Sequence, residues 1–514
     1  MSVSTPPSPP VHRRTRSRLS LIAAATTLAA LSLCPPAAAF PIPVADAELP
    51  DLVTVDAIRT HLQNLETIAA YNGGNRATGT PGYDVTAQYV TDQLRRAGYT
   101  VTRDHYSFEQ WVEHSDPVLT QTAPQHREFT PGDDFLSMAY SGAGDVTAPA
   151  VPVDATGADS GCEDADFADF PAGAIAILKR GTCTFEEKAA RAADAGAVGA
   201  VIFNHGDTPN DTGPINGTVS NPAAIPVVGA STEVGEALLA AGDGLELHLK
   251  VDASVEEAHS YNLIAETRGG DRNNVVVVGA HLDSVAEGPG TNDNGSGVAT
   301  VLEIAKQLNR LGTPRNKVRF AFWGSEESGL IGSTSYVERL SEKERERIAL
   351  YLNFDMLGSS NYARLIYDGR NELPGSVPAP SGSAAIQKVF EDYFTARGLA
   401  AEPTEFSGRS DYRAFMLAGI PSGGLFSGAD GTKTAEQAAR YGGTAGEQFD
   451  PYYHTADDTL AHINWASIDE LSDGAAYAVE VFADSTLPVN GVAPLRARTL
   501  AEPSFDRCGD RWER

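Results

Sequence analysis

Five short segments of the chain place side chains that can bind a metal or move a proton just after hydrophobic runs or in glycine-rich loops. The segments are "GAHLDS", "GTNDNGSG", "WGSEESG", "NFDMLG" and "DPYYHTADD". Their candidate residues are His281, Asp283, Asp293, Glu326, Glu327, Asp355, Tyr453 and His454. Two histidines and three or more carboxylates, with no thiolate among them, suit zinc or a related divalent metal. Adjacent acids such as Glu326 and Glu327 repel each other, and a divalent cation relieves that repulsion.

Taken singly, each segment has a simpler explanation, because an Asp at the end of a strand is commonly a helix cap or a turn residue. The elements around the segments change this interpretation. Hydrophobic runs from Asn274, Val318 and Ile348 predict strands, and the apolar periodicity over 298–308, 333–340, 383–396 and 467–483 predicts helices. Strands that alternate with helices indicate an α/β sheet, in which the carboxyl ends of parallel strands share one cleft. We therefore expect the segments to converge.

The remainder of the chain divides into regions that differ in hydrophobic periodicity and in Gly and Pro content. Helices are expected over 55–69 and from Pro81 to Ala97, joined by the loop "GGNRATGTPG". From about Ser141 to Val251, short β-like runs alternate with Gly and Pro around one alanine-rich helix, which indicates a separate small domain. Residues 488–514 show no apolar period and are expected to form a loose tail.

Charge and the N-terminus limit the class of protein. The chain has 514 residues and a formal net charge of −29, which excludes a basic nucleic-acid surface. Residues 1–39 have an arginine-rich start, an apolar run over 19–33 and an A-x-A site at Ala37–Ala39. This pattern predicts a secretory signal peptide, too short in its apolar part for a membrane span. We expect a soluble exported monomer, with no membrane or nucleic-acid partner.

Four cysteines occur in the chain, and Cys34 lies within the expected signal peptide. Cys162 and Cys183 are 21 residues apart within one segment, so a disulfide between them is plausible in an oxidising compartment. Cys508 is left over in the tail.

The segments together resemble the secreted bacterial and vacuolar (aminopeptidase Y-like) members of the co-catalytic di-zinc aminopeptidases. The likeness includes "GNRATGTPGYD", "GAHLDS", "NDNGSGVA", "FWGSEESGLIGS", "YLNFDMLGS", "GRSDY" and "YYHTADDT". The segment "KRGTCTFEEKAARAADAGAVGAVIFNH" resembles a protease-associated domain, whose paired cysteines fall at Cys162 and Cys183. The resemblance implies a mixed, mostly parallel sheet sandwiched by helices. It also implies peptidase parts at 40–140 and 252–487 with the protease-associated domain at 141–251 between them.

The resemblance also implies roles for individual residues. Asp293 would bridge two zinc ions, with His281 and Asp355 completing one site and Glu327 and His454 the other. Asp283 would accept the His281 ring N–H. Glu326 would take a proton from metal-activated water, and Tyr453 would stabilise the oxyanion. Met356, Arg409 and Phe426 would surround the first side-chain pocket, favouring Leu, Phe or Met at peptide or protein N-termini.

Two departures and two alternatives accompany this hypothesis. Relatives can carry a disulfide flanking the final His, whereas this chain has Tyr452 and Asp457 there, so we expect that loop to be held otherwise. A calcium site of some relatives has Trp465 in place of an acid, and we predict no calcium. The alternatives are a non-enzymatic binding protein on the same fold and a related carboxypeptidase or glutaminyl cyclase. The complete ligand set argues against the first, and "NDNGSGVA" with "GRSDY" favours the aminopeptidase over the second.

Overall fold

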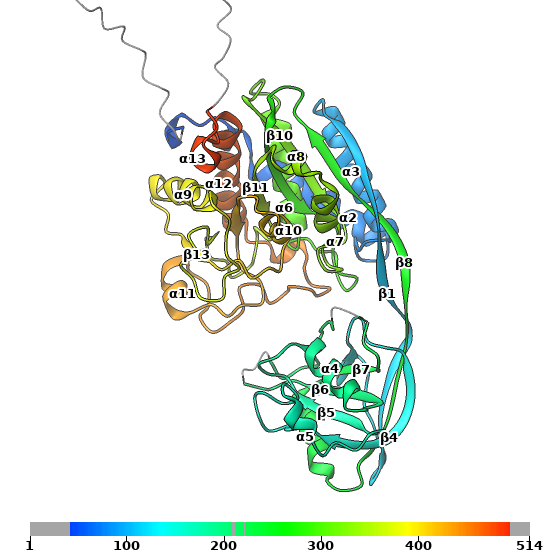
Figure 1. The fold of residues 1–514 in the computed structure, drawn as a ribbon. Coiled ribbons are helices and arrows are strands. Elements are labelled where there is room, and N and C mark those ends of the chain that lie inside the picture. Colours follow the sequence, from blue (N-terminus) through cyan, green and yellow to red (C-terminus); the bar gives the residue numbers. More distant parts are fainter. Residues whose placement is uncertain (1–41, 208–210, 220–221, 494–514) are drawn as a thin grey trace, which may run out of the picture. The chain divides into compact units, whose positions relative to one another are not determined.

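The computed structural model of the chain describes residues 42–207, 211–219 and 222–493 (Figure 1). The predicted signal peptide, Cys508 and the tail beyond residue 493 lie outside the described residues. None of the described helices has both the length and the apolar character needed to cross a membrane.

A continuous sheet of fourteen strands connects the described residues, in the order β13-β12-β14-β11-β9-β10-β8-β4-β5-β6-β7-β3, with β1 beside β8 and β2 beside β1. The peptidase-like half is formed by β13 (Glu402–Thr404), β12 (Leu365–Tyr367), β14 (Ser422–Phe426), β11 (Ile348–Phe354), β9 (Asp271–His281), β10 (Asn316–Trp323), β8 (Glu246–Glu266) and β1 (Thr100–Ala123). Strands β10, β9, β11 and β14 are parallel neighbours, whereas β8 and β12 run antiparallel to β10 and β14. The predicted mixed, mostly parallel sheet is confirmed.

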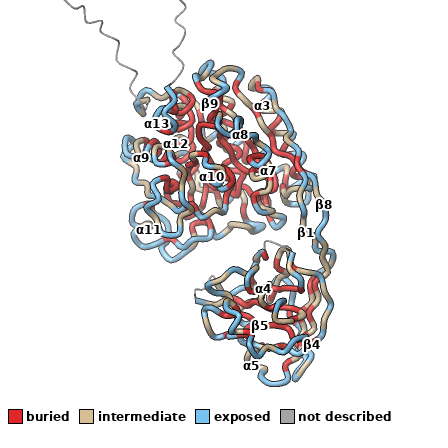
Figure 2. Tube along the Cα trace, in the orientation of Figure 1, coloured by how far each residue is buried: buried red, intermediate tan, exposed pale blue. Residues whose placement is uncertain are grey.

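Helices cover both faces of this half (Figure 1). On one face, Val275 and Val277 of β9 pack with α7 (Ile331–Arg339) and α10 (Tyr412–Leu417) in a core rich in aromatic rings. The other face of β9 carries Val276 and Val278, and it meets α6 (Gly295–Leu308) and α12 (Trp465–Asp484). Helices α2 (Val55–Tyr71) and α3 (Pro81–Arg96) pack on α6, and α9 (Ser383–Ala396) packs on β14 and α12. The strands between these layers are buried on both faces, as Figure 2 shows.

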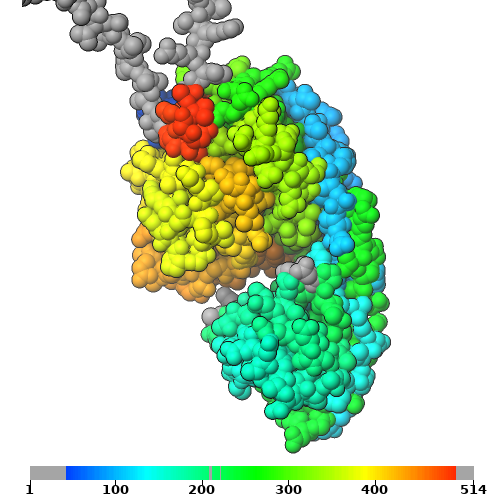
Figure 3. Space-filling model, viewed as in Figure 1, coloured from blue at the N-terminus to red at the C-terminus, as the bar shows by residue number. Residues whose placement is uncertain are grey.

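Shorter elements complete this half. They are η1 (Val44–Asp46), α1 (Leu49–Leu52), α8 (Glu342–Arg345), α11 (Ala435–Tyr441), η4 (Leu460–His462) and α13 (Leu487–Asn490). In Figure 3 the chain from α9 to α11, coloured yellow to orange, forms one contiguous part of the surface. Helix α13 falls in the stretch expected as a loose tail, and its Val489 is buried. A four-residue helix is too short to give an apolar period, which is why the sequence pattern missed it.

The second half contains β4 (Gly144–Pro152), β5 (Ile175–Lys179), β6 (Gly199–Phe203), β7 (Val227–Ala230) and β3 (Phe135–Ser137). Helices α4 (Phe185–Asp194) and α5 (Thr232–Ala241), η2 (Asp164–Phe167) and the two-residue β2 (Arg127–Glu128) accompany them. Strands β4 to β7 are parallel and carry two hydrophobic cores. Cys162 and Cys183 form the predicted disulfide, with their Cα atoms 5.7 Å apart.

Strands β1 and β8 are the longest strands, and the sequence pattern did not predict them. They have 24 and 21 residues and pair antiparallel along nearly their whole length, from Thr100 opposite Glu266 to Ala123 opposite Glu246. Strand β8 pairs with β4 through residues 246–251 and with β10 through residues 263–266. It therefore runs through the boundary expected at residue 251.

Candidate metal centre

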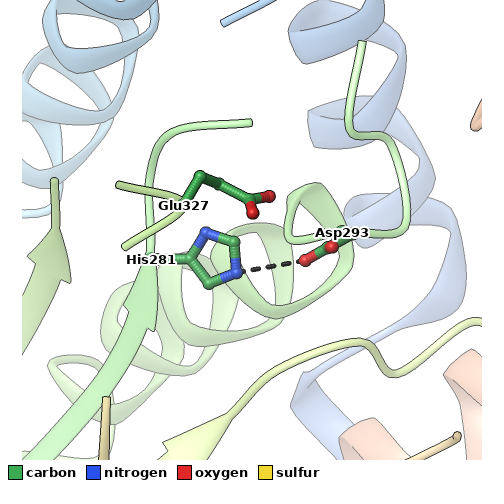
Figure 4. Close-up of side chains that lie close together, drawn as sticks. All are labelled: His281, Asp293 and Glu327. Carbon is green, nitrogen blue, oxygen red and sulfur yellow. Dashed lines mark ion pairs between the residues drawn. The ribbon is translucent and has the colours of Figure 1, made fainter. Parts of the chain in front are cut away.

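Five predicted ligand side chains meet at the carboxyl ends of the parallel strands. The two carboxylate oxygens of Asp293 face different histidines: Oδ1 lies 3.1 Å from His281 Nε2, and Oδ2 lies 3.2 Å from His454 Nε2. Asp355 Oδ1 lies 3.2 Å from His281 Nε2. Glu327 Oε2 lies 3.1 Å from His454 Nε2. Figure 4 shows the His281 ring at the end of its strand, with Asp293 and Glu327 reaching it from two separate loops.

These distances fit divalent metal sites. Ligand atoms about 2.0–2.1 Å from a tetrahedral zinc ion lie about 3.3 Å from one another, close to the four separations above. The set is made of imidazole nitrogens and carboxylate oxygens, the donors that zinc takes when no thiolate is present. Two buried ligand atoms, Glu327 Oε1 and His454 Nε2, have no hydrogen-bond partner among the described residues. Buried polar atoms are rarely left unsatisfied, and a bound cation would satisfy both.

Close backbone packing brings the Asp293 loop to the end of β11. Asn294 caps α6 by accepting from the Gly297 N–H (2.9 Å), and its side-chain amide donates to Phe354 O (3.0 Å). A Cβ atom on Gly297 would lie 2.2 Å from Phe354 O, so only glycine permits this approach. Asp293 and Asp355, which are 62 residues apart in the sequence, are held together in this way.

The Asp283 carboxylate contacts the backbone of the glutamate pair. It accepts from the N–H groups of Glu326 (3.2 Å) and Glu327 (3.3 Å). The His281 Nδ1 atom lies 3.3 Å from the Asp283 backbone oxygen and 3.8 Å from its carboxylate. The expected contact between Asp283 and the His281 ring is therefore made by the Asp283 backbone oxygen. The Asp283 side chain instead holds the loop that carries Glu326 and Glu327.

The two glutamates lie in different surroundings. Glu327 groups with His281 and Asp293, and Glu326 groups with His281 and Asp355. Ser325, directly before the pair, has a left-handed backbone (φ 55°), as do Met356 and His454 (φ 57° and 58°). Such conformations are uncommon for non-glycine residues and concentrate at functional sites. Ser325 precedes the glutamate pair, Met356 follows Asp355, and His454 is itself a candidate ligand, so all three conformations occur within the site.

A cavity of about 260 Å³ opens beside these groups. Its wall includes the three expected pocket residues Met356, Arg409 and Phe426, together with Tyr453 and Glu326. Aromatic rings form part of the wall, and those of Tyr367 and Phe426 lie nearly parallel with their centroids 6.3 Å apart. The site is thus a metal-ligand cluster joined to a cavity whose wall combines apolar and aromatic side chains with charged and polar ones.

Comparisons with known proteins agree with this geometry. The profile of peptidase family M28 matches residues 262–479, and that of the PA domain matches residues 146–238. An aminopeptidase of Pseudomonas aeruginosa is 48% identical over 449 residues, covering 86% of this chain and 83% of the relative. The chain belongs to peptidase family M28. A probable leucine aminopeptidase 2 of Aspergillus fumigatus is 39% identical over 466 residues, covering 89% and 90% of the two chains.

Solved structures of family M28 share the fold of the chain. The zinc aminopeptidase BSAP of Bacillus subtilis superposes with a TM-score of 0.65 at 27% identity, covering 86% of this chain and 98% of BSAP. This M28 peptidase is therefore a metallo-aminopeptidase, a hydrolase that acts on peptides. The non-enzymatic alternative is excluded.

The concentration of buried acids perturbs their ionisation. Burial raises the pKa of Glu327 to about 7, with the Asp293 charge adding to the shift. Burial also raises the pKa of Glu326 well above its ordinary value, and the neighbouring Glu327 and Asp355 carboxylates add to it. Burial lowers the pKa of His454, but the carboxylates of Asp293 and Glu327 outweigh it and raise the pKa to about 10. The clustered carboxylates of the site therefore favour the binding of positively charged groups.

Several further residues of the M28 peptidase hold this site, and the sequence pattern did not single them out. Asp458 accepts from the backbone N–H groups of Asn292 (2.7 Å) and Asp293 (3.0 Å). Ser410 donates to Asp355 Oδ2 (2.6 Å). The fully buried Arg76 donates to the backbone oxygens of Leu282, Pro289 (2.9 Å) and Gly290 (2.7 Å). Ser410 and Asp458 lie within "GRSDY" and "YYHTADDT", so the motifs were a signal, but their roles required coordinates.

The loop that carries His454 is held by aromatic stacking. The Tyr452 ring stacks on His462 with centroids 3.6 Å apart, and the His462 Nδ1 atom lies 2.8 Å from Asp457 O. Trp465 lies under the Arg59 guanidinium, 4.2 Å from its carbon to the ring centroid. These contacts occupy the positions at which the sequence departs from the family pattern.

Proposed function

We propose that this metallo-aminopeptidase holds two zinc ions and removes large apolar residues, leucine above all, from the N-termini of peptides and proteins. The observation that carries the proposal is the division of the Asp293 carboxylate, whose two oxygens face His281 and His454 on opposite sides. His281 and Asp355 would hold one ion, Glu327 and His454 the other, and Asp293 both. A pair of zinc ions in such a site acidifies water and polarises the substrate carbonyl.

Glu326 is the proposed general base. It lines the cavity and lies close to His281 and Asp355. In the proposed assignment His281, Asp355 and Asp293 supply the donors to that ion, which leaves the Glu326 carboxylate to act on the water. Its carboxylate takes the proton of the attacking water and later delivers this proton to the leaving amine. The Asp283 carboxylate fixes the backbone from which Glu326 and Glu327 extend, so each glutamate keeps its own task.

Tyr453 is the proposed donor to the oxyanion of the tetrahedral intermediate. Its ring stacks on His454 with centroids 3.7 Å apart, and Arg409 donates to its hydroxyl (3.3 Å). Arg409 is held in turn by Asp430 (3.0 Å). A hydroxyl that already accepts from a cation directs its own hydrogen elsewhere, and the cavity that Tyr453 lines is the place for the substrate.

The shape and lining of the cavity support the substrate preference. Met356, Leu365, Phe426 and Phe449 give it an apolar wall, which suits a branched or aromatic side chain. The free α-amine of a peptide is cationic or metal-binding, so the carboxylate-rich end of the cavity would select N-termini. The relative in Aspergillus fumigatus is named a probable leucine aminopeptidase.

The proposal includes export. The N-terminal pattern over 1–39 supports a cleaved signal peptide, and the disulfide between Cys162 and Cys183 suits an oxidising compartment. We further propose that the mature enzyme acts as a monomer.

One experiment tests the activity and the cofactor together. Purified enzyme is assayed on Leu-p-nitroanilide and on its N-acetylated form, and bound zinc is counted by elemental mass spectrometry before and after chelation. The expected result is two zinc ions per chain, hydrolysis of the free-amine substrate alone, and loss of activity on chelation. Equal cleavage of the blocked substrate, a single ion at full activity, or no response to chelation would refute the proposal.

A further inference from the structure

A second pocket lies where the central parallel strands begin, at the opposite end from the metal centre. It has a volume of about 370 Å³, and its charged wall consists of Glu266, Arg272, Lys317, Arg319, Glu344 and Arg347. In the strand register, Val275 of β9 pairs with Lys317 of β10 on one side and with Ile348 of β11 on the other. Val275 is six positions before His281 along β9, so the pocket lies about 20 Å from the metal centre.

Both acids of this pocket are already engaged. Glu266 accepts from Arg319 Nε (2.8 Å) and Nη2 (2.5 Å), and Arg319 also donates to the Tyr336 hydroxyl. Glu344 accepts from the backbone N–H (2.9 Å) and the hydroxyl (2.5 Å) of Ser341, as part of the capping box of α8. Arg319 neutralises Glu266, whereas Glu344 keeps its negative charge and attracts Arg347. The four cations of the wall nevertheless outnumber its two acids, so the pocket carries an excess of positive charge.

Three cations of the pocket form no close ion pair with an acid among the described residues. Lys317 is 4% exposed, and its ammonium donates to the backbone oxygen of Thr267 (2.5 Å). Within the part of the chain that the structure describes, Lys317, Arg272 and Arg347 form no ion pair with a carboxylate. A buried ammonium without a counter-ion is costly, and three like charges around one pocket repel. An anion in the pocket removes both penalties.

The charge of the whole chain makes this arrangement unusual. The formal net charge is −29, and yet the start of the central sheet gathers unpaired cations from three separate segments, around 272, 317 and 347. Figure 1 shows α8, which supplies one wall, beside β10. Val275, Leu340 and Ile348 add an apolar surface to the pocket. The space exceeds that of a single small ion, and an apolar wall accommodates an organic part of a ligand.

We propose that this pocket is a binding site for a phosphate group, either as inorganic phosphate or as part of a small phosphorylated molecule. Guanidinium groups match the geometry of phosphate oxygens, and Lys317 supplies a point charge deeper in the pocket. Binding neutralises Arg272, Lys317 and Arg347 and ties the starts of β9 and β10 to the residue before β11. The site is separate from the catalytic centre and does not depend on the proposed peptidase mechanism.

The test is isothermal titration of the zinc-loaded enzyme at low ionic strength, with inorganic phosphate in one arm and glucose 6-phosphate in the other. Arg347→Gln and Lys317→Met each remove one proposed contact. Arg345→Gln is the matched control, because Arg345 is an exposed residue at the end of α8, two residues before Arg347, and does not line the pocket. A titration with glucose controls for binding through the sugar part of glucose 6-phosphate alone.

We expect saturable binding of one phosphate probe per chain, weakened at least tenfold by Arg347→Gln and by Lys317→Met and less than twofold by Arg345→Gln. The tighter of the two probes identifies whether the ligand is free or esterified phosphate. The proposal is overturned if neither phosphate probe binds saturably. If Arg345→Gln weakens phosphate binding as much as the other two variants, the proposal is also overturned, because the effect would then reflect the overall charge of this surface and not a contact in the pocket. Binding that is unchanged in all variants would place the phosphate elsewhere, including at the metal centre. Arg347 is partly exposed, so its variant remains informative if Lys317→Met fails to fold.

Discussion

Replacing Asp458 with Asn changes one atom and tests how the Asp293 loop is held. The Asp458 carboxylate is buried and accepts two backbone N–H groups, from Asn292 at 2.7 Å and from Asp293 at 3.0 Å. An Asn side chain keeps one acceptor and turns an amide N–H toward the other donor. A buried backbone N–H that is left without its acceptor costs about 1.5–3 kcal/mol. This corresponds to about a 10- to 100-fold loss, the range observed when partners of metal ligands are removed.

We expect this loss to show in zinc affinity, because Asp293 supplies oxygens to both proposed ions. The assay is competition against a chromophoric chelator, with thermal unfolding of the metal-free protein measured in parallel. Asp457→Asn is the control, since Asp457 is adjacent, exposed and equal in charge change. Wild-type zinc affinity in Asp458→Asn, or an equal loss in Asp457→Asn, would refute the reasoning.

Three further predictions concern the same site. Glu326→Gln should lower kcat by about 10²- to 10⁴-fold while two zinc ions remain bound, and loss of zinc in that variant would mean that the roles of the glutamates are reversed. Tyr453→Phe should lower kcat on Leu-p-nitroanilide by about 10²-fold with little change in KM, and an unchanged kcat would remove Tyr453 from the mechanism. Burial raises the pKa of Asp411 to about 7 and that of Asp458 to about 8, so the folded metal-free protein binds these protons more tightly than the unfolded chain. The contribution of these two protons to stability is complete below the ordinary carboxyl pKa and is lost as the pH rises through 7 to 8. The Tm of the metal-free protein should therefore fall from pH 5 to pH 8.5, and it should fall less steeply in Asp411→Asn. An equal slope of Tm against pH in that variant would contradict the assignment.

The central sheet and the convergence of the ligands could be predicted from the sequence because both follow from short-range patterns. The β-branched run before His281 and the hydrophobic runs before Glu326 and Asp355 predict strands buried on both faces, and parallel strands end at a common edge. The amphipathic spacing predicted α9 at the residues found, 383–396. These inferences needed no knowledge of distant contacts.

The elements that escaped prediction depend on partners far away in the sequence. The middle parts of β1 and β8 bury few residues and show no regular alternation, because they are stabilised by pairing with each other. Arg76 and Asp458 bind backbone groups of loops more than 150 residues distant, and no side-chain pattern reports such a contact. The phosphate pocket likewise combines cations from segments that are separate in the sequence.

The paired strands β1 and β8 also determine how the molecule can be cut and rejoined. Val112 and Ser254 are cross-strand partners, and Cα atoms of antiparallel partners lie about 4.5–5.5 Å apart. The chain segment between these two residues contains the disulfide and both hydrophobic cores of the second half. Its two ends are therefore neighbours on the paired strands β1 and β8. A two-residue Asn-Gly turn spans such a gap, so the long insert could be exchanged for a hairpin tip without breaking the sheet that carries His281. The insert is thus connected to the peptidase part through one pair of antiparallel strands, β1 and β8.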